Sequence, residues 1–311
     1  MLLATSAQAA TLPGIPEFID EMVAKHHFKR NELDDLFERA QHRPEIIEAI
    51  TRPATIKPWP EYRAAFVNSK RVKLGVEFWD KYHLTLQRAT RQYGVPTEII
   101  VAIIGVETIY GRNAGSFRTI DALTTLAFDY PRRAPFFRSE LENYLLLARD
   151  QEFDLLAVRS SYAGALGIPQ FMPSSYRNYA VDFNGNHKID LLHEDRDAIG
   201  SVANYMKAYG WITDEPVASL TRVDLAICTS DIKTPRTLQD WANDGFTPLH
   251  KVVYDKPARL MDFTVEEGKE FWLAYNNFDV ITKYNNSDFY AMSVFQLAEA
   301  IKVAHSRKVT R

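Results

Sequence analysis

The stretch from Ile99 to Gly111, IIVAIIGVETIYG, is predicted to decide the fold. Its first eight residues are apolar on every side except for one glycine, which is typical of a helix buried inside a domain. Pro96 suits the first turn of such a helix, and Gly111 would end it. Glu107 would then lie near the C-terminal end, where burial and the helix dipole both favour a neutral carboxyl. A neutral carboxyl is what a general acid needs, although a lone glutamate here would more often be a solvated residue at a frayed helix end.

The sequence on either side of this stretch is mostly helical in pattern. Apolar residues recur at three- and four-residue spacing in several segments. These segments are Ile15–His26, Lys70–Tyr93, Ser139–Arg149, Ala198–Tyr209 before Gly210, and 289–304, with Pro173 predicted to start another helix. Arg52-Pro53 and Lys57-Pro58-Trp59-Pro60 predict an extended connection between the first two segments.

The pattern changes between residues 216 and 275, where β-rich or alternating segments appear. Ala258–Val265 and Lys269–Tyr275 are predicted to be strands, with a turn at Glu266-Glu267-Gly268 between them. The sequence therefore predicts a mainly α protein with a small β-containing insertion. The expected organisation is a helical domain (14–93), a catalytic core (94–215), a small β-containing domain (216–275) and a C-terminal segment (276–311) that returns to the core and the helical domain.

Composition excludes several classes of function. The formal net charge of −3 gives no overall basic field for nucleic acid or for an anionic membrane surface. No segment reaches the roughly 18 consecutive apolar residues of a transmembrane helix. Cys228 is the only cysteine, so it can form no intramolecular disulfide and is expected to be a buried, inert thiol. Nothing demands more than a monomer.

The first 13 residues have some features of an export signal. Ala7-Gln8-Ala9 has the small-x-small form of a signal-peptidase site, although a basic segment before it is missing. A signal-peptide remnant and a disordered N-terminus fit this stretch about equally well. No cysteine lies nearby to accept a lipid. The expectation is an exported, soluble, periplasmic protein.

A second group of motifs has the composition of a sugar-binding surface. The small residues of Ser161–Gly167 would let the backbone approach a ligand closely, although glycines also serve simple helix packing. Ser161 and Gln170 offer hydrogen bonds, while Tyr162 and Phe171 offer flat apolar faces. Such a mixture suits a carbohydrate.

Taken together, these motifs resemble the soluble lytic transglycosylase B family. The resemblance covers roughly residues 14–305 and rests on long motifs in a fixed order. They are Glu107-Thr108-Ile109-Tyr110-Gly111, Ser161–Gly167, Gln170–Tyr176, Asp182-Phe183, Asp197–Tyr205, Tyr284-Asn285-Asn286-Ser287 and Tyr290-Ala291-Met292. The resemblance implies a lysozyme-like helical core with a helical domain and a small β domain.

The resemblance also implies an activity. Members of the family cleave the β-1,4 bond between N-acetylmuramic acid and N-acetylglucosamine in peptidoglycan and leave a 1,6-anhydro ring. Glu107 would be the general acid and then the base, with no second carboxylate and no required cofactor. The resemblance implies substrate-binding roles for Ser161, Gln170, Phe171, Tyr284, Asn285, Tyr290, Arg132, Arg133 and Tyr62. For the two arginines, a solvated loop is the alternative.

Residues 182–197 contain a potential cation loop. Oxygen ligands would come from Asp182, Asn184, Asn186 and Asp190, from the carbonyl of Lys188, and from Asp197 or Glu194. His187 replaces the usual glycine at the sixth position of an EF-hand, and His193 replaces the usual glutamate at the twelfth. Fewer charges predict weak Ca²⁺ or Na⁺ binding, and a metal-free Asx-turn loop is the alternative. His187 and His193 lack the further ligands of a zinc site.

Two rival functions remain open on the sequence. A lysozyme-like hydrolase could use the same acid, although the motifs contain no evident second carboxylate. A non-catalytic peptidoglycan-binding protein would have no need of Glu107 beside Ser161, Gln170 and Asn285. The chemical form of the released product distinguishes the three.

Overall fold

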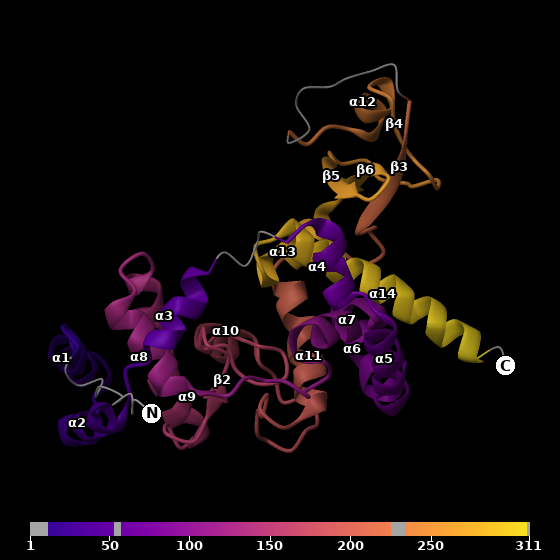
Figure 1. Cartoon of the computed structure of the whole chain (residues 1–311). Coiled ribbons are helices and arrows are strands. Elements are labelled where there is room, and N and C mark those ends of the chain that lie inside the picture. The colour runs from indigo at the N-terminus through magenta and orange to yellow at the C-terminus, as the bar shows by residue number, and fades with distance from the viewer. Residues whose placement is uncertain (1–11, 53–56, 225–233, 310–311) are drawn as a thin grey trace, which may run out of the picture. The chain divides into compact units, whose positions relative to one another are not determined.

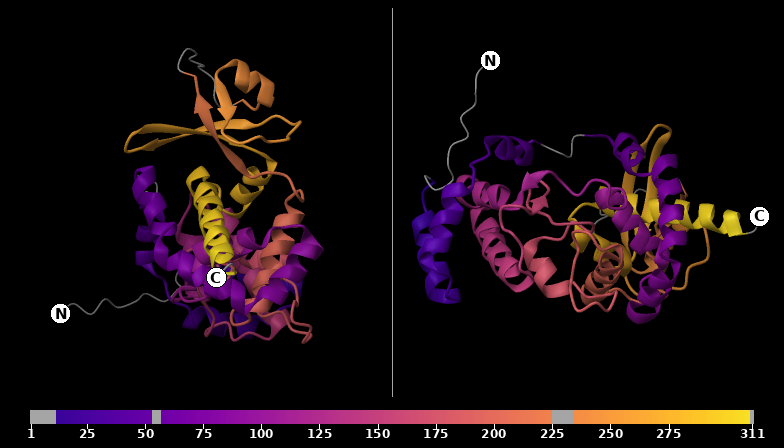
Figure 2. Two further views of the ribbon diagram at one scale, coloured as in Figure 1. Left: turned by 90° about the vertical axis from the view of Figure 1, so that its right-hand side faces the viewer. Right: turned by 90° about the horizontal axis from the view of Figure 1, so that it is seen from below.

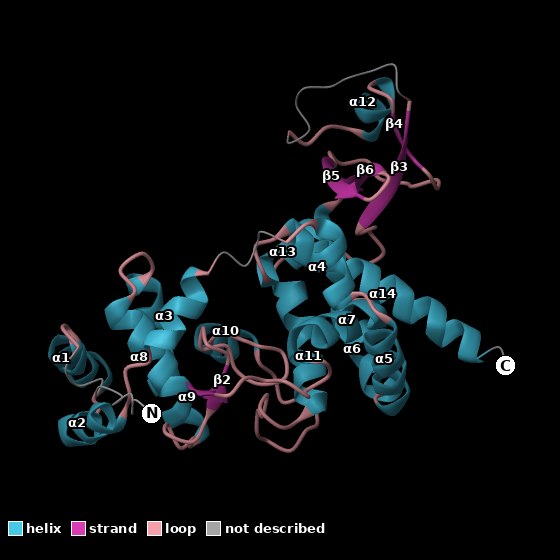
Figure 3. Cartoon of the chain, viewed as in Figure 1, coloured by secondary structure: helices cyan, strands magenta, loops and turns pink. Residues whose placement is uncertain are grey.

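The computed structural model describes residues 12–52, 57–224 and 234–309. Most of this part of the chain is helical, and its longer strands gather in one small antiparallel sheet (Figure 3). The predicted mainly α fold with a β-containing insertion is confirmed. None of the described helices combines the length and the apolar character needed to cross a membrane. The signal-peptide motif Ala7-Gln8-Ala9 and the single cysteine, Cys228, lie outside the described residues.

The chain forms two compact units, and each unit is built from two separate segments of sequence. The first unit contains the described residues up to 52 and residues 111–198. Its helices are α1 (Ile15–His26), α2 (Arg30–Arg39), α3 (Pro44–Thr51), α8 (Thr119–Asp129), α9 (Ala134–Gln151) and α10 (Pro173–Tyr179), and its strands are β1 (Phe117–Arg118) and β2 (Arg159–Ser160).

The core of the first unit forms around α8, whose residues from Thr119 to Ala127 are all buried. Helix α9 packs along α8, and α10 packs on α9 (Figure 1). The short strands β1 and β2 pair antiparallel, with Phe117 opposite Ser160. Pro173 begins α10, as the sequence predicts, because a proline in the first turn needs no amide hydrogen.

The second unit contains the described residues from 57 to 110 and from 199 to 309. Its helices are α4 (Trp59–Phe66), α5 (Ser69–Lys81), α6 (His83–Tyr93), α7 (Thr97–Thr108), α12 (Leu238–Asn243), α13 (Asn276–Tyr284) and α14 (Asp288–Val309), and its strands are β3 (Ala218–Val223), β4 (Phe246–Pro248), β5 (Arg259–Val265) and β6 (Gly268–Ala274). Helix α11 (Asp195–Ala208) begins in the first unit, and its residues from Ile199 belong to the second.

Helix α7 is the central helix of the second unit. All its residues from Ile99 to Val106 are buried, which confirms the prediction from the apolar run. Helix α14 packs along both α7 and α5, and two views show it beside these helices (Figure 2). The segments that form this core are therefore far apart in the sequence.

The sheet of the second unit has the strand order β4-β3-β6-β5. Strands β5 and β6 form the predicted hairpin, with Val265 opposite Gly268 across the turn. One face of the sheet packs on α12 through a small apolar core that includes Trp241, Phe246 and Leu273. The indole nitrogen of Trp241 donates a hydrogen bond of 2.8 Å to the carbonyl of Ala258, which satisfies its only polar atom.

Several boundaries differ from the predictions, and α9 in particular spans Ala134–Gln151 where the pattern predicted Ser139–Arg149. Helix α4 begins at Trp59, where the prolines predicted an extended chain, because Pro60 occupies the first turn and needs no partner for a missing amide. The long helical pattern at Lys70–Tyr93 is broken at Tyr82 into α5 and α6. Helix α7 ends at Thr108 rather than at Gly111, because Ile109 and Tyr110 already take left-handed backbone angles.

Candidate active site

Glu107 lies in the last turn of α7, directly after the buried run. The helix ends at the next residue, Thr108, and Ile109 after it has a φ of 53° and an amide that donates to the carbonyl of Gly105. A left-handed conformation is unfavourable for a β-branched residue, so the surrounding packing must hold this turn in place. Glu107 is partly exposed, although Val106 and Thr108 on either side of it are buried. The residue therefore lies in a tightly packed environment, although part of its surface stays exposed.

A hydrogen bond from Tyr290 fixes the carboxyl of Glu107. The Tyr290 hydroxyl donates to Glu107 Oε1 at 2.5 Å, and the tyrosine side chain is only 2% exposed. Tyr290 lies in the first turn of α14. The Ser287 hydroxyl accepts a hydrogen bond of 3.3 Å from the Tyr290 amide, and thereby caps the helix. The position of Tyr290 against Glu107 thus follows from where α14 begins.

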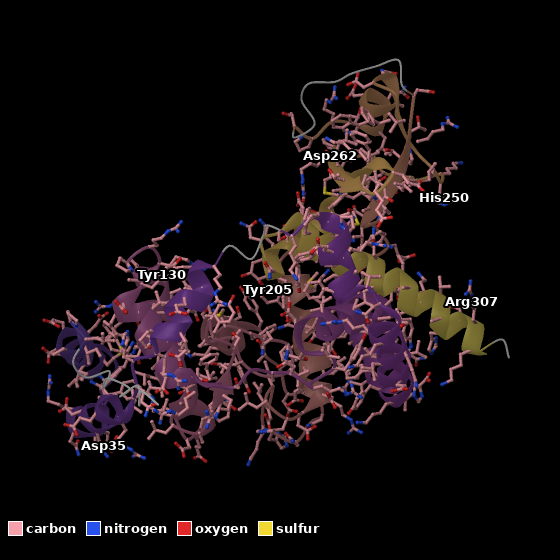
Figure 4. The ribbon with its side chains drawn as sticks, viewed as in Figure 1. Asp35, Tyr130, Tyr205, His250, Asp262 and Arg307 are labelled. Atoms are coloured by element: carbon pink, nitrogen blue, oxygen red, sulfur yellow. The ribbon has the colours of Figure 1, made fainter. Side chains whose placement is uncertain are left out.

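Further aromatic rings extend this arrangement. The rings of Tyr284 and Tyr290 are nearly parallel, with centroids 6.5 Å apart. Tyr205, labelled in Figure 4, contacts Tyr284 edge to face at 4.8 Å, and its hydroxyl donates to the carbonyl of Lys283 at 2.7 Å. The predictions did not single out Tyr205 as a site residue. The sequence did offer a signal, because Tyr205 ends the 197–205 motif and stands four residues before Tyr209, against which its ring stacks.

Tyr62 approaches the same carboxyl from α4. Burial raises the pKa of its phenol, and the negative charge of Glu107 raises that pKa further. Its ring packs against Phe66 and Phe289, with centroids at 5.0 and 5.5 Å. Asn285, which follows α13, has extended backbone and an exposed side chain. The second unit therefore brings Tyr62, Tyr284 and Tyr290 around Glu107, with Asn285 next to Tyr284 in the chain.

Burial raises the pKa of Glu107 to about 7, against an ordinary value of 4.5, while the hydrogen bond from Tyr290 acts to lower it. No second carboxylate of the described residues contributes to this shift. Burial and the charge of Glu107 also raise the pKa of Tyr284 and of Tyr290 well above the ordinary value, so both phenols stay neutral. Near neutral pH, Glu107 can therefore give up a proton or accept one, as acid–base catalysis requires.

Ser161 lies in the first unit, in a tight turn after β2. Its hydroxyl accepts a hydrogen bond of 3.1 Å from the Ala165 amide, and its backbone pairs with Ala165 as well. Gly164 has a φ of 82°, and a β-carbon there would lie 2.4 Å from the Leu123 side chain. Gly167 has a φ of 67°, and a β-carbon there would lie 2.1 Å from the carbonyl of Leu191. These glycines are thus required by packing, whatever else they do.

Gln170 and Phe171 follow in the same unit. The amide nitrogen of the Gln170 side chain donates to the carbonyls of Ala114 and Gly167 at 3.1 and 2.9 Å. This leaves its amide oxygen as the group it can offer to a ligand. The Phe171 ring is 2% exposed, so it supports the turn from inside the unit. Their predicted contacts with substrate stay predictions.

Arg132 and Arg133 are exposed in the turn between α8 and α9. The guanidinium of Arg133 lies over the rings of Phe136 and Phe137, at 4.4 and 5.2 Å from their centroids. This contact orients one arginine on the surface of the first unit, where carboxylates of a ligand could reach it.

The loop at 182–197 holds its shape through carboxylates that accept backbone hydrogen bonds. The carboxylate of Asp182 accepts from four successive amides, those of residues 184 to 187. Asp197 is fully buried and accepts from the amides of Phe183, Asn184 and Asp190 at 2.8, 3.1 and 3.0 Å. Several of the oxygens predicted to bind a cation thus already serve the backbone.

His187 occupies the position at which EF-hand loops usually have glycine, and it adopts a φ of 66°. The loop therefore has the local turn of such a site without its usual residue. Asn184 and Asn186 accept hydrogen bonds from the amides of Asn186 and Lys188. Across the described residues, no group of three or more His, Cys, Asp or Glu side chains is placed to hold a metal. Any cation here would depend on amide and backbone oxygens as well.

Comparison with known proteins gives a consistent result. The family model described as transglycosylase SLT domain matches residues 11–299. The chain is 43% identical over 305 residues to membrane-bound lytic murein transglycosylase B of Escherichia coli, covering 95% of this chain and 84% of that protein.

Solved structures show the same similarity. The crystal structure of the E. coli lytic transglycosylase Slt35 in complex with calcium matches with a TM-score of 0.90 and 41% identity, over 98% of this chain and all of that chain. The structure of SltB3 from Pseudomonas aeruginosa with NAG-anhNAM-pentapeptide matches with a TM-score of 0.84 and 29% identity, over 93% of this chain and 78% of that chain.

Proposed function

The chain belongs to the transglycosylase SLT domain family, and on this premise we propose that it is a lytic murein transglycosylase acting on peptidoglycan. The observation that carries the proposal is the carboxyl of Glu107, which has a pKa of about 7 and accepts the hydrogen bond from Tyr290. The expected bond is the β-1,4 link from N-acetylmuramic acid to N-acetylglucosamine.

In the first step, neutral Glu107 donates its proton to the glycosidic oxygen as the bond to C1 of the muramic acid breaks. The leaving N-acetylglucosamine keeps the oxygen and the proton. A positive, oxocarbenium-like centre develops at C1 and needs stabilisation. Because no second carboxylate among the described residues contributes to the pKa shift of Glu107, we assign this stabilisation to the N-acetyl group of the substrate itself, as in substrate-assisted glycosidases.

In the second step, ionised Glu107 accepts the proton of the C6 hydroxyl while O6 forms a bond to C1. This closes the 1,6-anhydro ring, returns Glu107 to its neutral form and consumes no water. The pKa of about 7 makes the carboxyl an adequate acid in one step and an adequate base in the next. The hydrogen bond from Tyr290 fixes the position of the carboxyl throughout.

The remaining predicted substrate residues are proposed with the same reaction. Tyr62, Tyr284 and Asn285 would contact the sugars next to Glu107. Ser161, Gln170, Phe171, Arg132 and Arg133 are proposed substrate-binding residues of the first unit, with the arginines directed to carboxylates of the peptide stem or the lactyl group. The pentapeptide-bearing ligand of the relative SltB3 supports a substrate of this chemistry.

The loop at 182–197 is proposed to bind Ca²⁺ or Na⁺ weakly. Its oxygen donors are of the right chemical kind, and the relative Slt35 crystallised with calcium. No step of the reaction needs this ion. A millimolar calcium addition should raise the melting temperature of the wild type and not that of Asp182→Asn. Equal shifts in both proteins would exclude specific binding here.

The proposed location is the periplasm, where peptidoglycan lies. The relative from E. coli is described as membrane-bound. The export motif of this chain falls outside the described residues.

Mass spectrometry of the products from purified peptidoglycan tests the reaction. The wild type should release fragments one water lighter than hydrolysis products, and Glu107→Gln should release none. Glu98→Gln is the matched control, since Glu98 lies in the first turn of α7 and pairs with Lys302 instead. Products of hydrolytic mass would favour the lysozyme-like alternative. Binding without release by the wild type would favour a non-catalytic protein.

A further inference from the structure

The guanidinium of Arg71, on α5, contacts the ends of two other helices. Its Nε donates to the carbonyl of Gly105 at 3.1 Å, and Nη1 donates to the carbonyl of Ala65 at 2.7 Å. Gly105 lies in the last turn of α7, which carries Glu107, and Ala65 lies in the last turn of α4, which carries Tyr62. One side chain thus joins the two helices that place these groups.

Both contacts are to last-turn carbonyls that already accept one other hydrogen bond, Gly105 from the Ile109 amide and Ala65 from the side-chain amide of Asn68, so the guanidinium is a second donor to each. The last carbonyls of a helix lack some of the partners that an interior turn supplies, and their negative dipole favours a cation nearby. An arginine can serve two of them at once because its donors form a rigid planar fork, which the single ammonium of lysine cannot reproduce. The guanidinium also lies over the Phe66 ring, 5.2 Å from its centroid. Its orientation is therefore fixed from three sides.

A hydrogen bond from Tyr110 joins the end of α7 to α5 a second time. Its hydroxyl donates to the backbone carbonyl of Arg71 at 2.9 Å. The ring fits only because two glycines leave room, since a β-carbon on Gly105 or Gly75 would lie 2.5 or 2.6 Å from the hydroxyl oxygen. Tyr110 has a φ of 59°, so the turn after Glu107 is held in a strained conformation by this contact. Arg71 and Tyr110 form a reciprocal clamp on the end of α7.

We propose that Arg71 is a positioning residue, which acts through the clamp with Tyr110 to hold Glu107 in the place that proton transfer requires and Tyr62 beside it. The inference rests on the proposed transglycosylase function. It assigns to α5 a role in the reaction, although none of the described side chains of α5 is among the causes that shift the pKa of Glu107.

The clamp has a consequence for the protonation of Glu107. The groups that face the carboxyl are the phenols of Tyr290 from α14, Tyr284 from α13 and Tyr62 from α4. Burial is the main cause of the raised pKa of Glu107. The guanidinium of Arg71 donates to the carbonyls of Gly105 and Ala65 and is not among the causes of that shift. A loosened turn would admit water, and the pKa of Glu107 would fall towards 4.5. Because the acid must be neutral to act, the alkaline limb of the pH profile would move to lower pH.

The test compares Arg71→Met and Arg71→Lys with Arg149→Met. Arg149 is a matched control in the first unit, since it donates to the last-turn carbonyl of His26 at 2.8 Å and lies over the Phe28 ring at 4.8 Å. Arg71→Met should lower kcat by about 10- to 100-fold, as small misplacements of catalytic groups do, with KM almost unchanged. Its alkaline limb should move to lower pH. Arg71→Lys should recover part of both effects, and Arg149→Met should show neither.

Tyr110→Phe is a milder variant in case Arg71→Met fails to fold. It removes only the hydroxyl that donates to Arg71, and it should shift kcat and the alkaline limb in the same direction. Titration of the Glu107 carboxyl by ¹³C NMR gives a readout independent of turnover. The inference is wrong if folded Tyr110→Phe and Arg71→Lys keep the wild-type kcat and Glu107 pKa. Failure of the proposed function itself would be visible separately, as a wild type that releases no anhydro fragments.

Discussion

At the scale of the single residue, the environment of Glu107 turns an ordinary carboxylate into a group that titrates near neutrality. Its position in the last turn of a buried helix removes water, and the Tyr290 hydroxyl compensates only part of that loss. The same feature that allows catalysis should also reduce stability at higher pH, because the folded protein must then bury a charge.

This conflict predicts a pH-dependent effect of Glu107→Gln on stability. Between pH 4.5 and about 7, folded wild type keeps a proton that the unfolded chain has released, so its free energy of unfolding falls as pH rises through this window. Glutamine does not titrate. The free energy of unfolding of the variant should equal that of the wild type near pH 4 and exceed it by about 3 kcal/mol near pH 8. This figure follows from the pKa shift from 4.5 to about 7, at about 1.4 kcal/mol for each pH unit. Urea denaturation at several pH values measures this difference. A constant difference across the range would show that the pKa of Glu107 is not raised.

At the scale of the element, the end of α7 is shaped by its fit against α5 rather than by its own sequence. Gly105 lowers the helix propensity of α7 by about 1 kcal/mol relative to alanine, which is unfavourable unless the space is needed. The Tyr110 ring fills that space and makes the last turn of α7 incompatible with a side chain at position 105.

Gly105→Ala is therefore expected to destabilise the protein, although alanine is the better helix former. The added β-carbon would lie 2.5 Å from the Tyr110 hydroxyl oxygen and 2.7 Å from its ring carbon, and overpacking of this kind costs about 1–3 kcal/mol. The free energy of unfolding from urea titration checks the sign. In a Tyr110→Ala background the clash is absent, so adding Gly105→Ala to that variant should cost little further free energy of unfolding. A Gly105→Ala protein more stable than wild type would mean that the ring moves aside freely.

The elements also show where reasoning from the sequence stops. The buried run of α7, the start of α10 at Pro173 and the β5–β6 hairpin follow from local patterns, and the structure confirms them. Helix α4 could not be predicted from its prolines, because Pro60 is compatible with the first turn of a helix but does not require one. Its first residue, Trp59, is 2% exposed and packs on Phe263 and Phe289 at 4.7 and 5.2 Å, so contacts distant in sequence stabilise a helix that local rules place in a loop.

At the scale of the whole molecule, each unit is assembled from two segments that the other unit separates in the sequence. Helix α7 belongs to the earlier segment of its unit, and α14, which covers it, belongs to the later one. A break in the chain after Tyr110 therefore divides both cores, since it separates the two segments of each unit.

A chain that ends at Tyr110 should not fold cooperatively, because it would leave the apolar residues from Ile99 to Val106 without α14. Residues 56–110 joined to 199–311 by a flexible Gly-Ser linker contain every segment of the second unit, and they should give a cooperative thermal transition by circular dichroism. A cooperative transition of the chain ending at Tyr110 would contradict this account of the cores.

The sequence by itself determined the fold class, the buried helix, the position of Glu107 on it and the family motifs, because these depend on local periodicity and on residues adjacent in the chain. Only the tertiary structure decided which groups face the carboxyl, since Tyr62, Tyr284 and Tyr290 lie on helices that meet through long-range packing. It also showed that Phe171 is buried and that the Asp182 carboxylate serves backbone amides. The pKa of Glu107 depends on three-dimensional burial, and no pattern of neighbouring residues could fix its value.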